Sequence, residues 1–374
     1  MRILLVSNYY PEHVGGIETV SATLAAGYRS RGHEVRWIAG DIRSRPHHGH
    51  ADDVPIRVWN GIERLGGFPY PLPGPLAAGR IRDEVRWSQA VHLHDCLYAV
   101  NLAAFAAARR EHRPVLLTQH VAKVPFPNPL VRGLQSVAYA SLGRAVLARA
   151  DQVVFVSAEV RRWFEARVRF RRPPLLIENG IDSELFRPAS AAERHAFRGE
   201  LGANGRQPLL LFVGRFVEKK GVRLLRPLIE ATPQWSWLLI GRAGDVDPSG
   251  WRLPNLNVLA PLSPARLREH YAAADLLVLP SSGEGFPVAA QEAMACGTPA
   301  LLSEATAAGV PAVRDSVFTT TLSSEDLHST TQAALTAIAA DDGFRERVAA
   351  VARERWFADG MVSRYEEQLE ALLH

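Results

Sequence analysis

The sequence predicts an α/β fold with two Rossmann-like domains, each built around a parallel β-sheet. Short, uninterrupted apolar runs alternate with helical segments along most of the chain, as expected of strands buried on both faces of a parallel sheet. This alternation stops at residues 187–208, which contain no strand signal, and then restarts. The chain has 374 residues, which is enough for two domains of ordinary size.

The elements of the first domain, which we place at residues 1–186, follow in a regular order. A loop at residues 8–16 separates the first strand from a helix that ends at Gly32. Residues 42–75 are rich in Pro, Gly, Arg and His, and we expect irregular surface loops there. The expected strands are residues 3–6, 34–39, 90–93, 115–118 and 153–157, and later helices are expected at residues 99–108 and 134–148.

The second domain, which we place at residues 187–356, begins with a helix and its flanking linkers. A further helix is expected at residues 288–295, directly before the last strand. Because open parallel sheets bind ligands beyond the carboxyl ends of their strands, we expect the two domains to face each other across a binding cleft. The expected strands are residues 209–213, 237–240, 258–259, 276–279 and 300–303.

The composition excludes several classes of protein. Hydrophobic residues make up 47% and charged residues 22% of the chain, which excludes disordered and fibrous proteins. Two cysteines are too few for a disulfide framework or a Cys-rich zinc site. No apolar run reaches the roughly 18 residues that a membrane span needs. The first residues, MRILLVSNYYPE, show no basic region or cleavage site, so we expect a cytoplasmic protein without a secretory signal.

The charge is distributed unevenly along the chain. Residues 1–190 contain 25 Arg and Lys against 17 Asp and Glu. A basic first half favours an anionic partner, such as the inner face of a membrane or a nucleic acid. The alternative is an Arg-rich composition without functional meaning, because only three of the 43 basic residues are lysines. Both explanations stay open.

Residues 283–299, GEGFPVAAQEAMACGTP, carry the clearest chemical signal. Pro287 suits the first position of a helix, and the amides around Gly285–Val288 would then form an anion-binding helix N-terminus. Glu284 in the preceding loop and Glu292 inside the helix would repel a phosphate, so we expect them to accept hydrogen bonds from sugar hydroxyls. The alternative is a strand–turn–helix on which Glu292 is merely solvated.

A second segment, LLLFVGRFVEKKG at residues 209–221, favours the same ligand. A buried strand ends in a loop that carries Arg215, Lys219 and Lys220 between two glycines. Arg offers a bidentate fork and Lys a point charge, which together suit a diphosphate. The alternative is a solvated turn with ordinary surface charges. A dinucleotide-binding G-x-G-x-x-G after a strand and a P-loop are both absent from the sequence.

Eight short motifs follow one another along the chain. They are Gly15-Gly16-Ile17-Glu18, Arg31-Gly32-His33-Glu34-Val35, Thr118–His120, Asn179-Gly180-Ile181-Asp182, Gly214-Arg215 with Lys220-Gly221, Ala274-Asp275 through Pro280-Ser281, Glu284-Gly285-Phe286-Pro287, and Glu292 through Pro299. Taken in order, these motifs resemble those of the retaining glycosyltransferases of family 4, which are two-domain enzymes of the GT-B architecture. The stretch 356–373 resembles the family's last helix, which crosses back to the first domain, so we assign residues 357–374 to that domain.

The resemblance implies a role for each matching residue. The donor would be a nucleoside-diphosphate sugar, bound chiefly by the second domain. The catalytic set would be His120, Arg215, Lys220 and Glu284. At the donor diphosphate, Gly15 and Gly16 would offer backbone amides, and Arg215 and Lys220 would neutralise the charge. Glu284 would bind hydroxyls of the donor sugar, together with the amides of Gly285, Phe286 and Val288, the residue after Pro287. Glu292 would hold the ribose hydroxyls, and His120 would lie near the anomeric carbon.

We expect no metal and no cofactor, because cationic side chains and a helix N-terminus can supply the positive potential that a departing diphosphate needs. The histidine pairs His48/His50 and His92/His94 do not resemble a metal site of the family. His94-Asp95, at the end of a strand, is a candidate for orienting the acceptor. The alternative for that pair is a hydrogen-bonded strand end.

The leading functional hypothesis is therefore a retaining, metal-independent glycosyltransferase acting on a saccharide or lipid-linked acceptor in cell-surface polysaccharide or glycolipid synthesis. The alternative is a nucleotide-sugar-binding protein, or an epimerase of related fold, without transferase activity. We expect no nucleic-acid partner. Peripheral docking on an anionic membrane is assigned to Arg161–Arg172, where arginines surround Trp163, Phe164 and Phe170. The alternative is that these aromatic rings are core residues.

Overall fold

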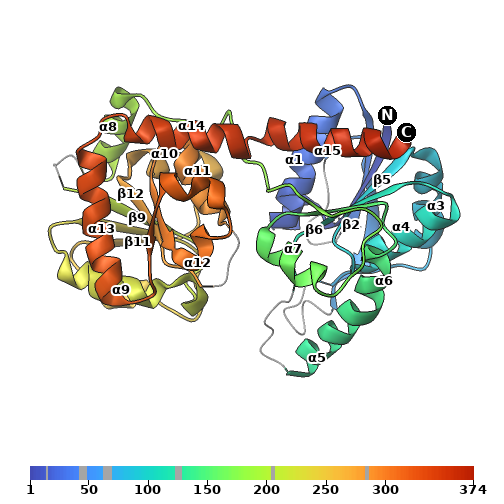
Figure 1. Cartoon of the computed structure of the whole chain (residues 1–374), viewed down its shortest axis with the longest axis horizontal. Coiled ribbons are helices and arrows are strands. Elements are labelled where there is room, and N and C mark those ends of the chain that lie inside the picture. Colours follow the sequence, from blue (N-terminus) through green and yellow to red (C-terminus); the bar gives the residue numbers. More distant parts are fainter. Residues whose placement is uncertain (14–15, 42–48, 62–69, 123–128, 204–206, 283–285) are drawn as a thin grey trace. The chain divides into compact units, whose positions relative to one another are not determined.

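The computed structural model describes residues 1–13, 16–41, 49–61, 70–122, 129–203, 207–282 and 286–374 (Figure 1). The chain divides into two compact units. Unit 1 contains Met1–Gly180 and Ala358–His374, and unit 2 contains Ile181–Phe357. Each unit is built around a largely parallel sheet covered by helices, so the predicted α/β fold with two Rossmann-like domains is confirmed.

The sheet of unit 1 has eight strands in the order β4-β3-β2-β1-β5-β6-β7-β8. Neighbouring strands are parallel except for β3 and β4, which are antiparallel. The strand order reverses direction between β1 and β5, and such a switch point is where open α/β sheets bind ligands. The strands are β1 (Arg2–Tyr9), β2 (Glu34–Asp41), β3 (Val54–Trp59), β4 (Leu72–Pro73), β5 (Ala90–His94), β6 (Val115–Gln119), β7 (Gln152–Phe155) and β8 (Leu175–Leu176).

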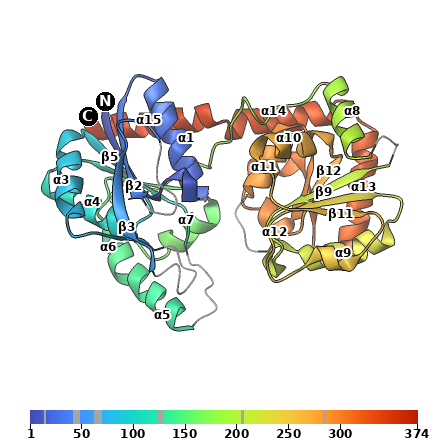
Figure 2. The same ribbon diagram turned by 180° about the vertical axis from the view of Figure 1, so that it is seen from behind.

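Helices cover both faces of this sheet because successive side chains of a strand point to opposite faces. Ile3 and Leu5 of β1 pack with α1 (Gly16–Ser30) and α15 (Ala358–Leu373). Leu4 and Val6 pack in a second core with the helices of the other face. These helices are labelled in Figure 2. The helices of that face are α3 (Ala77–Trp87), α4 (Ala99–Arg110), α6 (Arg144–Leu147) and α7 (Ala158–Glu165).

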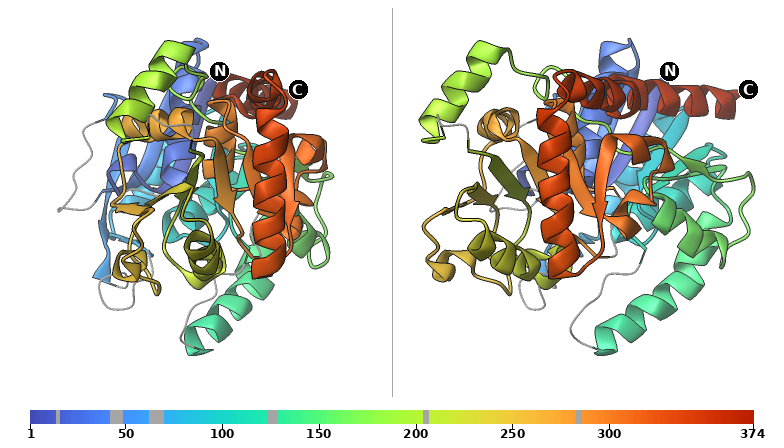
Figure 3. Two further views of the ribbon diagram at one scale, coloured as in Figure 1. Left: turned by 90° about the vertical axis from the view of Figure 1, so that its left-hand side faces the viewer. Right: turned by 60° about the vertical axis from the view of Figure 1, so that its left-hand side comes forward.

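The helix α5 (Pro129–Ala138) differs from the others because it extends away from the body of unit 1 (Figure 3). A π-helical turn, η2 (Tyr139–Gly143), joins it to α6. The helix expected at residues 134–148 therefore begins earlier and consists of three consecutive pieces. No helix in the described ranges combines the length and apolar character that crossing a bilayer requires.

The sheet of unit 2 has six parallel strands in the order β11-β10-β9-β12-β13-β14, and its order reverses between β9 and β12. The strands are β9 (Leu209–Val213), β10 (Ser236–Ile240), β11 (Leu256–Leu259), β12 (Leu276–Leu279), β13 (Ala300–Ser303) and β14 (Val317–Thr320). The helices are α8 (Ala191–Glu200), α9 (Val222–Ala231), α10 (Pro264–Ala273), α11 (Val288–Ala295), α12 (Glu304–Ala307), α13 (Ser324–Ala339) and α14 (Phe344–Trp356).

The structure differs from the expected elements in several places. Residues 42–75 are not all irregular, because Val54–Trp59 forms β3 and pairs with β2. Its buried side chains alternate with more exposed ones, and Pro55 is tolerated because the strand lies near the sheet edge. The strand β14 was also missed. Pro287 is the N-cap of α11 rather than its first helical residue, a shift of one position.

Candidate functional site

The loop after β9 carries the predicted phosphate-binding cations. Arg215 and Lys219 are exposed, and Lys220 is half-buried at the end of the short 3₁₀ turn η3 (Glu218–Lys220). A Cβ atom built on Gly214 would lie 3.8 Å from Cδ of Lys220, so the Lys220 side chain passes close to the end of the strand. The loop thus presents positive charge at the carboxyl end of a central strand.

Gly221 brings this loop against the segment that follows β12. Its φ is +71°, and a Cβ atom there would lie 2.0 Å from the carbonyl oxygen of Pro280. Ser282 also donates from its backbone N–H to the carbonyl oxygen of Lys219, at 2.8 Å. Because β9 and β12 are neighbours at the switch point, the two motifs found in the sequence meet at one edge of the sheet.

The helix α11 begins at this same edge. Its first amide belongs to Val288, while Pro287 accepts from the amide of Ala290 through its carbonyl oxygen, at 2.9 Å. The ring of Phe286 stacks on Trp356 with centroids 4.7 Å apart, so a ligand role for Phe286 falls to its backbone. Glu284 and Gly285, which the sequence assigns to the donor sugar, lie outside the described residues.

Glu292 lies one turn inside α11, and a tyrosine holds it. Tyr271 of α10 donates its hydroxyl to Oε2 of Glu292, at 2.9 Å, and Tyr271 itself is fully buried. Burial raises the pKa of the Glu292 carboxyl to about 7, although the Tyr271 hydrogen bond opposes that shift. Sequence reasoning missed Tyr271 because its own segment carries no motif, and only the packing of α10 beside α11 reveals the pair.

The corresponding edge of unit 1 contains a group of buried histidines. His120 follows β6 and is 9% exposed, and its Nε2 lies 2.9 Å from Nδ1 of His94 on β5. His92 lies on the same face of β5. Its Nδ1 is 3.2 Å from the hydroxyl oxygen of Tyr28, and its Nε2 is 2.8 Å from Oγ1 of Thr118. Burial lowers the pKa values of His92 and His120 to about 3 and that of His94 well below its usual value.

Hydrogen bonds connect the ends of β5 and β6 next to these rings. Asp95 has a positive φ of 73° and donates its backbone N–H to the carbonyl oxygen of Thr118, at 2.8 Å. Its Oδ1 accepts from the Gln119 side-chain amide, and Asn101 donates to the carbonyl oxygens of His94 and Asp95. Burial raises the pKa of Asp95 to about 7. The pair His94-Asp95 therefore forms a hydrogen-bonded strand end, which was one of its two alternatives.

The glycine loop of unit 1 is described only in part. Gly16 is the first residue of α1, and a Cβ atom there would meet nothing within 4 Å. Glu18 is buried in the first turn of the helix. Gly15 lies outside the described residues.

The aromatic rings of the proposed docking segment Arg161–Arg172 pack inward, although most of its arginines are exposed. Phe164 is 1% exposed and stacks on Phe155, and Trp163 and Phe170 pack against the same core. The expectation that these rings meet a membrane is therefore wrong for Phe164, because the amphipathic helix α7 turns its aromatic face inward.

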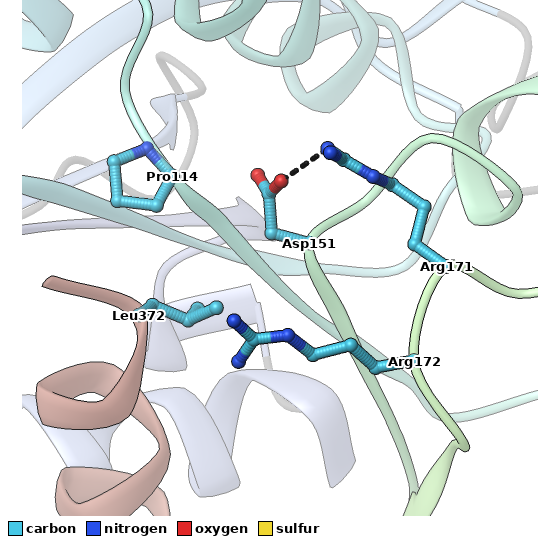
Figure 4. Close-up of a pocket in the computed structure, with 5 residues that line it drawn as sticks. All are labelled: Pro114, Asp151, Arg171, Arg172 and Leu372. Carbon is cyan, nitrogen blue, oxygen red and sulfur yellow. Dashed lines mark hydrogen bonds and ion pairs between the residues drawn. The ribbon is translucent and has the colours of Figure 1, made fainter. Parts of the chain in front are cut away.

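Arg171, at the end of that segment, forms an ion pair with Asp151, as Figure 4 shows. These two residues line a cavity of about 200 Å³ together with Pro114, Arg172 and Leu372. Pro114 and Asp151 precede β6 and β7, so the cavity lies at the opposite edge of the sheet from His120.

Comparison with protein families gives two matches that cover most of the chain. Residues 14–185 match the family described as Glycosyltransferase Family 4, and residues 193–355 match Glycosyl transferases group 1. A D-inositol 3-phosphate glycosyltransferase of Xylanimonas cellulosilytica is 31% identical over 80% of this chain and 76% of the relative. Its counterpart in Kineococcus radiotolerans is 28% identical over 77% of this chain and 72% of the relative.

Solved structures share the fold at low identity. Sucrose-phosphate synthase from Thermosynechococcus elongatus superposes with a TM-score of 0.75 at 18% identity, covering 100% of this chain and 99% of the other. Anabaena HepE in complex with UDP-glucose has a TM-score of 0.72 at 18% identity, covering 99% and 100%. WaaG, a glycosyltransferase involved in lipopolysaccharide biosynthesis, has a TM-score of 0.64 at 18% identity, covering 100% and 99%.

Proposed function

The chain belongs to the family 4 glycosyltransferases, and we propose that it transfers a sugar from a nucleoside-diphosphate donor to an acceptor with retention of the anomeric configuration. One observation carries the donor half of this proposal. The cationic loop after β9 and the segment that follows β12 meet at the switch point of unit 2, joined by the hydrogen bond between Ser282 and Lys219. That edge combines the positive charge of the loop with the start of α11 and the Glu292 carboxyl.

The chemistry of the leaving group fits these residues. When the sugar departs, negative charge develops on the diphosphate. Arg215, Lys220 and the amide of Val288 are the groups proposed to stabilise it, and preorganised donors of this kind are worth most where charge develops. Glu292 is proposed to accept hydrogen bonds from the ribose hydroxyls, with the assigned residues Glu284, Gly285, Gly15 and Gly16 completing the donor site.

We propose that transfer needs no metal, because Arg215 and Lys220 neutralise the charge of the departing diphosphate. The direct test is turnover in excess EDTA, which should stay at the level measured without chelator. Loss of turnover that manganese or magnesium restores would contradict the proposal. The first carboxylates to replace would then be Asp245 and Asp247, which lie two residues apart and currently accept from the amides of Glu218 and Ser249.

The nucleobase and the sugar are open to one experiment. Anabaena HepE is solved with UDP-glucose, and a starch synthase from Arabidopsis thaliana is solved with ADP. A panel of UDP-, GDP- and ADP-sugars should contain one series that raises the thermal unfolding temperature and is slowly hydrolysed without acceptor. Stabilisation without hydrolysis or transfer by any acceptor would favour the nucleotide-sugar-binding protein instead.

For the acceptor we propose a lipid-linked saccharide reached from a membrane surface. The support comes from α5 and its continuation, where Leu134, Val137 and Leu142 are 72%, 64% and 53% exposed. Apolar side chains exposed together on a projecting helix, with Arg132 and Arg144 nearby, are typical of helices that lie in the headgroup region.

Vesicle sedimentation tests this acceptor proposal. Wild-type protein should bind vesicles containing anionic lipid, and replacing Leu134, Val137 and Leu142 together by Ser should abolish binding. Replacing Arg161 and Arg162 by Gln is the matched control, since that segment packs its rings inward, and it should bind as wild type does. Absence of binding in wild type would favour a soluble acceptor, and D-inositol 3-phosphate, which the relatives are named for, would be assayed first.

A further inference from the structure

His94 contacts His120 and is not among the catalytic or donor-binding residues assigned above. Its ring is fully buried, and its Nδ1 lies 2.9 Å from Nε2 of His120. The two rings are 24° from coplanar with centroids 5.1 Å apart, so the N–H of one ring points at the lone pair of the other. This is a direct imidazole–imidazole hydrogen bond in which one ring must donate and the other must accept.

The direction of this hydrogen bond follows from the other nitrogen of His94. Nε2 of His94 is buried and has no hydrogen-bond partner in the part of the chain that the structure describes. A neutral imidazole has one N–H donor and one acceptor nitrogen. A buried N–H without an acceptor is rarer in proteins than an under-used acceptor, so the proton of His94 belongs on Nδ1. His94 then donates to Nε2 of His120.

The surroundings hold His94 in this position. The Asn101 side-chain amide donates to the carbonyl oxygen of His94, and the ring of His92 lies 4.6 Å away between centroids. His92 is itself fixed through both nitrogens, by Tyr28 and Thr118. Burial lowers the pKa values of all three rings, so each is neutral at physiological pH.

This arrangement has one consequence for His120. Its Nε2 accepts from His94, so its own proton resides on Nδ1. Nδ1 of His120 has no partner among the described residues, but unlike Nε2 of His94 it is not a fully buried atom, so its N–H is accessible to a ligand. We propose that His94 is a positioning residue that fixes His120 as the Nδ1–H tautomer, so that His120 donates a hydrogen bond to an oxygen of the bound sugar. The sugar half of this statement rests on the proposed function, whereas the tautomer does not.

Two variants separate positioning from packing. His94→Leu removes the donor at similar size, whereas His94→Asn keeps an N–H donor near the position of Nδ1. His92→Gln is the matched control, because His92 is a buried neighbour on the same face that does not contact His120 by a hydrogen bond in the described structure. Nitrogen-15 spectra of the histidine rings report the tautomer in the free protein. The His120 signals are identified by their absence from the spectrum of His120→Ala.

We expect wild type and His94→Asn to show the proton of His120 on Nδ1, and His94→Leu to lose that preference. Turnover should fall about tenfold in His94→Leu with little change in donor KM, and should stay within about threefold in His94→Asn, which is the effect of one hydrogen bond. His92→Gln should leave the tautomer unchanged. A proton on Nε2 of His120 in wild type, or equal turnover losses in the Leu and Asn variants, would overturn the proposal. The spectra need no substrate, so failure of sugar transfer would be seen separately.

Discussion

The carboxyl edges of the two sheets carry opposite kinds of polar group. In unit 1, His94, His120 and Asp95 are buried, and burial shifts their pKa values towards the uncharged forms. In unit 2, Arg215 and Lys219 are exposed charges on a loop, which is held by the backbone hydrogen bond from Ser282 to Lys219 and by the Asp245 carboxylate, which accepts from the amide of Glu218.

The difference follows from the cost of burying charge. A neutral ring can be buried and aimed in advance, provided that it is hydrogen-bonded, whereas an unpaired guanidinium or ammonium group must stay near water. On the proposed function, unit 1 would orient uncharged hydroxyls, and unit 2 would receive a diphosphate that brings its own negative charge. The following predictions test this contrast.

Removing either cation from the loop of unit 2 should have the largest effect. Arg215→Ala or Lys220→Ala should lower turnover about 10²–10³-fold, the typical loss of one preorganised group that stabilises developing charge. Arg223→Ala is the control, because Arg223 is exposed nearby and paired with Glu218, and it should keep wild-type turnover. If both loop variants turn over as wild type does, the diphosphate lies elsewhere.

Backbone contact, rather than charge, should control the shape of that loop. Gly221→Ala places a side chain at a positive φ, and its Cβ atom collides with the carbonyl oxygen of Pro280. We expect this substitution to lower the free energy of unfolding by roughly 3 kcal/mol or more. Gly32 in unit 1 has a similar φ of +82°, but a Cβ atom there would meet nothing within 4 Å. We expect Gly32→Ala to lower the free energy of unfolding by only about 1 kcal/mol. Thermal unfolding of the two variants measures the difference, and equal losses would show that the Pro280 contact is unimportant.

Glu292 should make nucleotide binding depend on pH. Its raised pKa means that the carboxyl is largely protonated below about pH 7 in the free protein and charged above it. Because the charged form would accept the proposed ribose hydrogen bonds, affinity for the nucleoside diphosphate should rise up to about tenfold between pH 6 and pH 8. Calorimetry on wild type and Glu292→Gln distinguishes this effect from titration of the diphosphate, since the variant should lack it.

The smallest expected effect concerns Tyr271, which opposes the pKa shift of Glu292. Tyr271→Phe removes that hydrogen bond, so the pKa of Glu292 should rise further and the midpoint of the binding curve should move to higher pH. Affinity at pH 7 should fall severalfold, as expected for one hydrogen bond to a charged group. An unchanged midpoint would mean that the tyrosine is only a packing residue.

Local patterns in the sequence were enough to identify much of the fold. The strand at residues 209–213 and the helix at residues 288–295 have the predicted bounds, because the strand is an uninterrupted apolar run and Pro287 marks the start of the helix. The strand β3 was missed because Pro55 and the surrounding polar residues hide its alternation. At the site, Arg215, Lys220 and Glu292 were chosen from motif and spacing, and their roles remain predictions.

Other features depend on contacts between segments far apart in the chain. Nothing near Trp163 or Phe164 in sequence distinguishes a ring that faces a membrane from one that faces the core, and only the packing of α7 decided it. The pairing of Tyr271 with Glu292 required two helices to lie side by side.

The sequence by itself determined the fold class, the family and the chemical types at the site, because these depend on local periodicity and on residues a few positions apart. The protonation and direction of the site groups were decided only by tertiary structure. His94 meets His120 because β5 and β6 are neighbours in the sheet, and Glu292 has its raised pKa because its surroundings exclude water. Burial and hydrogen-bond partners set these properties, and neither can be read from the identity of a residue.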